Sequence, residues 1–421
     1  MKRISDEQIQ RLSEILSEKI NKANVSFLKE IGKTIKRIKK LSPTKAHQLI
    51  QILRYGNKVD NVVDEISKLV NVNEKAIYKV FDEYAKIDQD FYEQFYKYRG
   101  IPFIPYEENE ILKRQTEAIV NIVGDKLKNL TGSRAIGYTI IDKNGNVVFK
   151  GIRETYESLL DEALLNVSQG KETLDSSLRR ILKSIGRSGL KYLDYESGRS
   201  IRIESMVNMH LMDGIRQLHN ENQKIYGNEF GSDGIEISVH EFPAEDHEEA
   251  QGRQFTNEEY ERLQNMGVAR DIDGEEVNIH RETKNGLADD FRPISQYNCY
   301  HYIFPIIIGV NKPEYSKEEL KNINKRNKDG FEFEGKHYTM YQGTQLQRKI
   351  ETEVRKNKDL QILARESDDK ELLIESQTKI NQLTNKYKEL CEVSGLPSKN
   401  KRMSVSGYHK IKINKKTIYK K

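Results

Sequence analysis

The chain of 421 residues has no tryptophan, two cysteines and eight prolines. Two cysteines are too few for a disulfide framework. No run of about eighteen or more apolar residues and no signal-peptide pattern occurs, so we expect a protein made in the cytosol that does not span a membrane. Hydrophobic residues make up 36% of the chain and charged residues 32%. This balance predicts modest cores and long amphipathic helices rather than one large globule.

Acidic residues are absent after Glu392, where nine basic residues follow. Because the net charge of the whole chain is +5, the part before this end is slightly acidic. Basic residues interleaved with aromatic and apolar ones can pair with phosphates and stack on bases. We predict non-specific contact with double-stranded DNA; the alternatives are an unstructured solubilising end or a strand added to a partner's sheet. The predicted DNA-binding residues are Lys399, Lys401, Arg402, Lys410, Lys412, Lys415, Lys416, Lys420 and Lys421.

The pattern predicts an α+β protein in four parts, of which residues 1–105 form a helical docking module. An N-cap signal at residues 5–8 precedes apolar residues spaced by three and four, typical of an amphipathic helix. Ser42-Pro43 breaks this helix and starts another, and a further helix starts at Glu74. Residues 100–105 form an extended, proline-containing linker before a helix at residues 107–130.

Residues 106–340 are predicted to form a central α+β domain. Its first feature is a hairpin at residues 138–149, turned by Asp142-Lys143-Asn144-Gly145-Asn146. Helices are expected near residues 156–168, 174–187 and 200–225. Arg199, Arg202 and Glu204 would then lie on successive helical turns, as exposed ion pairs or facing a site. Buried strands are expected at residues 235–239 and 303–310, with a loop at residues 267–285.

Residues 341–396 are predicted to be an amphipathic helical region, and residues 397–421 a basic tail. About two fifths of residues 344–392 are charged, and an apolar face runs through them at helical spacing. Asp368-Asp369 marks a break between two arms. Such a region serves as a packing element or as a contact with an oligomer or portal partner.

Side chains suited to chemistry are concentrated in residues 235–310, which carry four of the nine histidines and one of the two cysteines. A zinc site formed by His240, His247, Cys299 and His301 is one interpretation, although the spacing matches no standard zinc motif. A nucleophilic Cys299 with a histidine base is a second, without a recognisable nucleophile elbow. The interpretation favoured by the sequence is a buried structural polar network. Its residues are His240, Asp246, His247, Gln251, Asn298, Cys299 and His301.

The same segment resembles the phage minor capsid protein family (minor capsid protein 2 type), which is distantly related to Mu F-like and SPP1-type head morphogenesis proteins. In this family a strand-terminal histidine precedes an Asp/Pro-His pair and Gln-Gly, and an Asn-Cys-x-His box closes the region. The similarity extends over residues 135–396 and includes the arginine-bearing segment around Arg202. The positions that match the boxes are His240, Asp246, His247, Gln251, Gly252, Asn298, Cys299 and His301.

The resemblance implies a low-copy structural protein of a tailed-phage head, in the virion interior near the portal and in the host cytoplasm during assembly. The implied partners are the portal protein, the major capsid protein and packaged DNA, and the implied roles are head assembly, DNA packaging or genome delivery. The family's arginine between the two histidines is replaced here by Phe242-Pro243-Ala244-Glu245. No enzyme activity, catalytic residue or cofactor is implied. A metal-dependent hydrolase or nuclease, with zinc, and a toxin-like transferase using Arg202 and Glu204 are the alternatives.

Overall fold

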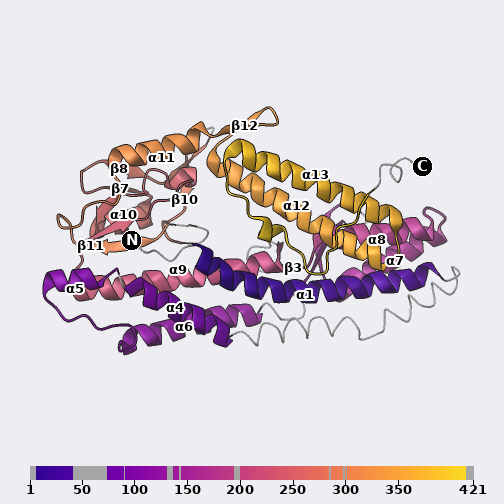
Figure 1. Cartoon of the computed structure of the whole chain (residues 1–421), viewed down its shortest axis with the longest axis horizontal. Coiled ribbons are helices and arrows are strands. Elements are labelled where there is room, and N and C mark those ends of the chain that lie inside the picture. Colours follow the sequence, from indigo (N-terminus) through magenta and orange to yellow (C-terminus); the bar gives the residue numbers. More distant parts are fainter. Residues whose placement is uncertain are drawn as a thin grey trace. The chain divides into compact units, whose positions relative to one another are not determined.

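The computed structural model of the chain describes residues 6–40, 74–89, 91–129, 136–141, 144–193, 200–283, 286–296, 299 and 301–413 (Figure 1). Helices accompanied by short strands confirm the α+β class. No helix among the described residues combines the length and the apolar character needed to cross a bilayer. The predicted helices that would begin at Ser42-Pro43 lie outside the described residues.

Contacts divide the chain into two compact units, each assembled from segments that are distant in sequence. The predicted division into four consecutive parts follows composition rather than contacts, and it stays a prediction. The first unit consists of Met1–Leu12, Glu74–Asp125 and Met209–Gln345. The second unit consists of Ser13–Asn73, Lys126–Asn208 and Leu346–Lys421.

A three-stranded antiparallel sheet organises the first unit. The central strand β5 (Gly234–Ile237) pairs on one side with β11 (Ile303–Ile306) and on the other with β6 (Gln254–Thr256). Ile237 lies opposite Ile303, and Ile235 lies opposite Phe255. The predicted strands at residues 235–239 and 303–310 are therefore confirmed, although both end earlier than the apolar runs suggest.

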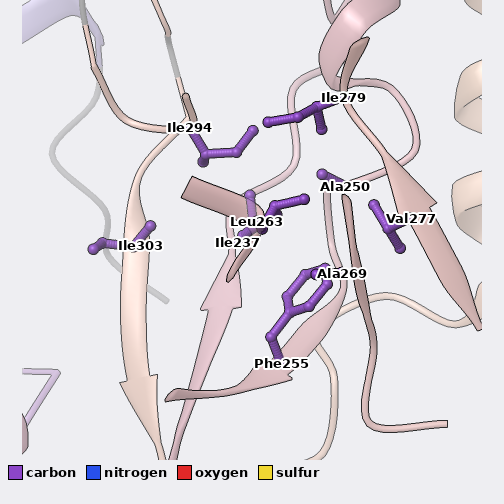
Figure 2. Packing of buried hydrophobic residues seen from close by; sticks show 9 residues of the cluster. All are labelled: Ile237, Ala250, Phe255, Leu263, Ala269, Val277, Ile279, Ile294 and Ile303. Carbon is purple, nitrogen blue, oxygen red and sulfur yellow. The ribbon is translucent and has the colours of Figure 1, made fainter. Parts of the chain in front are cut away.

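A cluster of buried apolar side chains packs against this sheet (Figure 2). Ala250 belongs to the turn that carries His247, and Ile303 follows His301 by two residues. The cluster therefore fixes the backbone on both sides of the candidate site. Its members are Ile237, Ala250, Phe255, Leu263, Ala269, Val277, Ile279, Ile294 and Ile303.

The prediction of a loop at residues 267–285 is wrong. This segment contains strands that pair in two short antiparallel hairpins and bury Ala269 and Val277 in the cluster. Two of these strands have only three residues, so their alternation is too short to appear as a pattern in the sequence. The elements are α10 (Asn257–Met266), β7 (Val268–Arg270), β8 (Glu276–Asn278), β9 (His280–Thr283) and β10 (Gly286–Phe291).

An aromatic stack joins helices α5 (Glu93–Arg99) and α9 (Ile203–Phe230) of the first unit. The ring of Tyr92 stacks on Tyr226 at 4.4 Å, and that of Phe95 stacks on Phe230 at 4.9 Å. Tyr92 and Phe95 are thus buried inside the first unit. The helices are α4 (Glu74–Gln89), α5 (Glu93–Arg99), α6 (Glu110–Asn129) and α9 (Ile203–Phe230), of which α6 and α9 extend beyond the unit. The remaining elements are α11 (Lys317–Asp329), β12 (Phe331–Phe333) and β13 (Lys336–Tyr338).

The second unit contains a four-stranded antiparallel sheet in the order β2-β1-β3-β4. The predicted hairpin at residues 138–149 is confirmed as the β1–β2 pair. Helix α8 buries Leu178, Ile181, Leu182 and Ile185. These residues follow one another at intervals of three, one and three positions, so they lie on one face of the helix. The elements are β1 (Ile136–Ile141), β2 (Val147–Gly151), α7 (Ile152–Ser168), α8 (Leu174–Ser188), β3 (Lys191–Leu193) and β4 (Ser200–Arg202).

Long helices complete the second unit. Helices α12 (Met340–Glu366) and α13 (Lys370–Ser394) run side by side (Figure 1), and Gln361 donates to Gln377 between them. The predicted break is confirmed, because the carboxylate of Asp369 accepts from the N–H of Leu372 and caps α13. Most of helix α1 (Asp6–Lys39) belongs to this unit. The 3-10 turn η3 (Asn400–Met403) belongs to it entirely.

The prediction that Arg202 lies exposed on a helix is wrong. Arg202 is the last residue of β4, and its side chain is buried with Nη2 3.0 Å from Oδ2 of the fully buried Asp359. Pairing with Lys191 of β3 holds its backbone extended, and α9 starts only at the next residue. Arg199 lies outside the described residues. The buried ion pair gives Arg202 a role in packing the second unit.

Candidate functional site

The candidate site lies in the first unit, beyond the paired ends of β5 and β11. The N–H of Ser238 donates to the carbonyl of Tyr302 at 2.9 Å, and the N–H of Tyr302 donates to Oγ of Ser238 at 2.8 Å. These bonds continue the β5–β11 ladder by one step. They hold His240 and His301 beside one another, with ring centroids 4.9 Å apart in an edge-to-face contact.

A tight turn brings His247 to the same place. The 3-10 turn η2 (Glu245–His247) is followed by further turns, and Gly252 returns to the sheet by donating its N–H to the carbonyl of Ile237. Gly252 has φ +70°, and a Cβ there would lie 2.5 Å from Leu320 and 2.8 Å from Val239. Only glycine fits this left-handed and crowded position. The Gln-Gly pair therefore closes the turn that buries His247.

Cys299 is at the centre of the site. Its Sγ lies 3.4 Å from Nδ1 of His247 and 3.5 Å from Nδ1 of His301. The backbone N–H groups of Ser295 and His301 also donate to this sulfur, at 3.2 Å and 3.4 Å. His247, Cys299 and His301 are all buried, and their ligand atoms lie within 4.8 Å of one another. Within the described part of the chain, these three residues gather as a set of possible metal ligands, whereas the predicted fourth ligand, His240, is not in the set.

Asp246 and Gln251 support the turn rather than the sulfur. Asp246 accepts from Nη2 of Arg292 at 2.8 Å, and the carbonyl of Arg292 accepts from Nε2 of His247 at 2.6 Å. Gln251 accepts from the N–H of His240 at 2.9 Å and donates to Asn324 at 2.7 Å. The network predicted from the sequence thus has most of its members in contact through these bonds. Asn298 lies outside the described residues.

Burial sets the protonation of the site. It lowers the pKa of His247, where the carboxylate of Asp246 acts in the opposite direction, and it lowers the pKa of His301 well below its usual range. Burial also raises the pKa of the Cys299 thiol. Both imidazoles are therefore neutral at pH 7, so each has one nitrogen lone pair available as an acceptor or a ligand.

Residues of α9 that the sequence did not single out hold the loop before Cys299. Arg216 donates to the carbonyl of Gln296 at 3.3 Å, and Asn220 donates to the carbonyl of Ser295 at 3.1 Å. His219 links Tyr84 of α4 to the carbonyl of Ile303 in β11, at 2.9 Å on each side. The available signal was the polar run at helical spacing from Arg216 to Asn220, in a helix that is otherwise apolar on one face.

The basic C-terminal end is partly packed. Residues 397–413 run along α12 and α13 of the second unit, where Met403 and Val405 are buried. Lys358 donates to the carbonyl of Met403, and Arg365 donates to that of Gly407. The alternative prediction, an unstructured solubilising end, is therefore wrong for residues 399–413. Lys399, Lys401, Lys410 and Lys412 are exposed and Arg402 partly so, whereas Lys415, Lys416, Lys420 and Lys421 lie outside the described residues.

Comparison with known protein families shows where the chain belongs. The family model for phage minor capsid protein 2 aligns with residues 4–392, which include the two strand ends, the turn with His247 and the Cys299-x-His301 pair. Neither the curated proteins nor the solved structures contain a significant match to the chain. The family match extends over most of both compact units and is not confined to one of them. The chain belongs to the phage minor capsid protein 2 family, whose members are structural proteins of the virion.

Proposed function

We propose that this minor capsid protein acts at the portal vertex inside the head of a tailed phage, in head assembly, DNA packaging or genome delivery. The observation that carries the proposal is the extent of the family match, residues 4–392. Membership of a capsid family also favours a structural role over hydrolase or transferase activity.

The portal protein is the proposed main partner, with the major capsid protein as the second. The test is to co-express the full chain with the portal protein and, separately, with the major capsid protein of the phage that encodes it, and to sediment the products. We expect the chain to co-sediment with the portal assembly. Co-sedimentation with the coat protein alone, or with neither, would contradict placement at the portal.

We call His247, Cys299 and His301, with the residues hydrogen-bonded to them, the His/Cys network. This network is proposed to hold the first unit in the form that is incorporated into heads. His247→Ala and Cys299→Ala each leave buried polar groups without partners, which costs about 1–3 kcal/mol of unfolding free energy. We expect both variants to lower the melting temperature and incorporation into heads together. Cys391→Ala, in the second unit, is the control: it removes one acceptor of Gln347 Nε2, which keeps its bond to the carbonyl of Pro397. Normal stability combined with abolished turnover of some substrate would instead favour an enzyme.

The basic end is proposed to bind DNA without sequence preference. Deleting it would also remove the buried side chains of Met403 and Val405, so charge substitution is the cleaner test. We expect Lys→Gln at Lys399, Lys401, Lys410 and Lys412 together to weaken binding to duplex DNA at low salt. The slope of log K against log salt should become shallower by about 0.9 for each phosphate that these lysines no longer neutralise.

Lys→Arg at the same four positions is the control, because it keeps the charge and the packed segment. This variant should bind duplex DNA as the unchanged chain does. If the Lys→Gln variant binds DNA at low salt with the affinity of the unchanged chain, these residues do not bind DNA. Circular dichroism of both variants verifies that the second unit, including the segment along α12 and α13, remains folded.

A further inference from the structure

The three central side chains of the His/Cys network have the separations of metal ligands. In a tetrahedral zinc site, a sulfur at about 2.3 Å and a nitrogen at about 2.0–2.1 Å from the ion lie about 3.5–3.6 Å apart. The observed Sγ–Nδ1 separations are 3.4 Å for His247 and 3.5 Å for His301. Each sulfur–nitrogen separation therefore matches that of a tetrahedral site, and the three ligand atoms lie within 4.8 Å of one another.

The ring of His247 is oriented as metal-ligating histidines usually are. Its Nε2 faces the carbonyl of Arg292 at 2.6 Å, and because a carbonyl only accepts, the ring proton must be on Nε2. Nδ1 then presents its lone pair toward Cys299. In metal sites a hydrogen bond of this kind, from the other ring nitrogen to a backbone carbonyl, fixes the tautomer and orients the ligand.

The surroundings of Cys299 favour a thiolate once a cation is present. Two backbone N–H groups, from Ser295 and His301, point at Sγ and stabilise negative charge on it. Without a cation, burial disfavours this charge. A bound metal ion removes this conflict because it deprotonates a coordinating thiol outright.

His301 offers its Nδ1 to the same position, and its other ring nitrogen, Nε2, is enclosed by the protein. It is 2% exposed, and its Nε2 has no hydrogen-bond partner in the described part of the chain. The two ring nitrogens point in different directions, so this unpaired Nε2 marks a place for a water molecule, and only Nδ1 can bind an ion beside Cys299. The ring of the half-buried His240 contacts this ring edge to face, at 4.9 Å between centroids, but His240 is not among the residues whose ligand atoms lie together, so a fourth coordination position falls to water.

We propose that His247, Cys299 and His301 bind one zinc ion and that this ion ties the turn after β5 to the segment before β11. One thiolate and two neutral imidazoles form a ligand set that suits zinc, and hard cations such as magnesium and calcium prefer oxygen ligands. The ion joins His247 to Cys299, which lies 52 positions later in the sequence. The site is thus a cross-link within the first unit.

The test uses the full chain, purified without metal-chelating tags. The chain is dialysed first with zinc and then against metal-free buffer, and its metal content is measured. We expect one zinc per chain. Because zinc has no d–d spectrum, cobalt(II) is then titrated into the metal-free protein. We expect saturation at one equivalent, with thiolate-to-cobalt charge-transfer absorption and the strong visible bands of tetrahedral cobalt. A folded chain that binds cobalt without charge-transfer absorption, or binds no metal, overturns the proposal.

The two cysteines provide a matched pair of variants. Cys299→Ser should abolish the charge-transfer absorption and weaken zinc binding by at least about 100-fold, because losing a direct ligand costs more than losing an outer partner. Cys391→Ser, which leaves the site intact, should retain both. If Cys391→Ser rather than Cys299→Ser abolishes the absorption, the proposed site is wrong. Should Cys299→Ser fail to fold, alkylation of the unchanged chain decides: zinc should protect Cys299, and equal alkylation with and without zinc overturns the proposal.

Discussion

Arg202→Ala is expected to destabilise the protein by about 3–5 kcal/mol, because it leaves the carboxylate of Asp359 buried without its cation. Asp359 is fully buried, and the guanidinium of Arg202 lies 3.0 Å from it. Gly189, with φ +65°, allows this arrangement, since a Cβ there would lie 2.5 Å from Nη1 of Arg202. A folded domain is stable by only about 5–15 kcal/mol. The midpoint of urea unfolding, followed by circular dichroism, should fall sharply.

The control for this prediction is Arg187→Ala in the same unit. Arg187 pairs with Glu375 at 3.9 Å, and its side chain is 65% exposed. Exposed ion pairs contribute about 0–1 kcal/mol, so the unfolding midpoint should change little. Equal effects of the two substitutions would show that the buried pair does not support the second unit.

Phe255→Ala is expected to cost about 3–5 kcal/mol, because it removes a buried ring and leaves a cavity in its place. Phe255 is fully buried in β6, opposite Ile235 of β5, and belongs to the cluster in Figure 2. Since β5 leads into the turn with His247, the same substitution should loosen the His/Cys network. Faster alkylation of Cys299, together with a lower unfolding midpoint, would be the measured result.

Met266→Ala is the matched control for Phe255→Ala. Met266 lies at the end of α10, next to the same cluster in sequence, but its side chain is 60% exposed. Its removal should change the unfolding midpoint little and leave the alkylation rate of Cys299 unchanged. If Phe255→Ala unfolds no more easily than Met266→Ala, the cluster is not the core of the first unit.

The sequence predicted the elements whose signal is long or local. Helices α12 and α13 were predicted because an apolar face repeats over many turns, and the β1–β2 hairpin because Asn144-Gly145 is a strong turn signal. The hairpins formed by β7 to β10 were missed, since such short strands gain their stability from the cluster they cover. Arg202 was placed on a helix because its burial depends on Asp359, which is 157 residues away.

The candidate site was predicted in its residue types but not in its support. His247, Cys299 and His301 stood out because histidine and cysteine are rare in this chain and concentrated in one segment. Their mutual distances depend on the β5–β11 register and on the left-handed Gly252, which composition does not reveal. Arg216 and Asn220 were missed because their side chains donate hydrogen bonds from α9 to backbone carbonyls of a loop 75 to 80 residues later. Backbone carbonyls have no sequence signature.

The most direct test of the structural role is to measure the chain in intact particles. Purified, DNA-filled heads of the phage that encodes it should contain a few copies per particle, by quantitative mass spectrometry against the major capsid protein. Asymmetric electron cryomicroscopy should place these copies inside the head at the portal vertex. Absence from purified heads, despite expression during infection, would contradict a structural role in the virion.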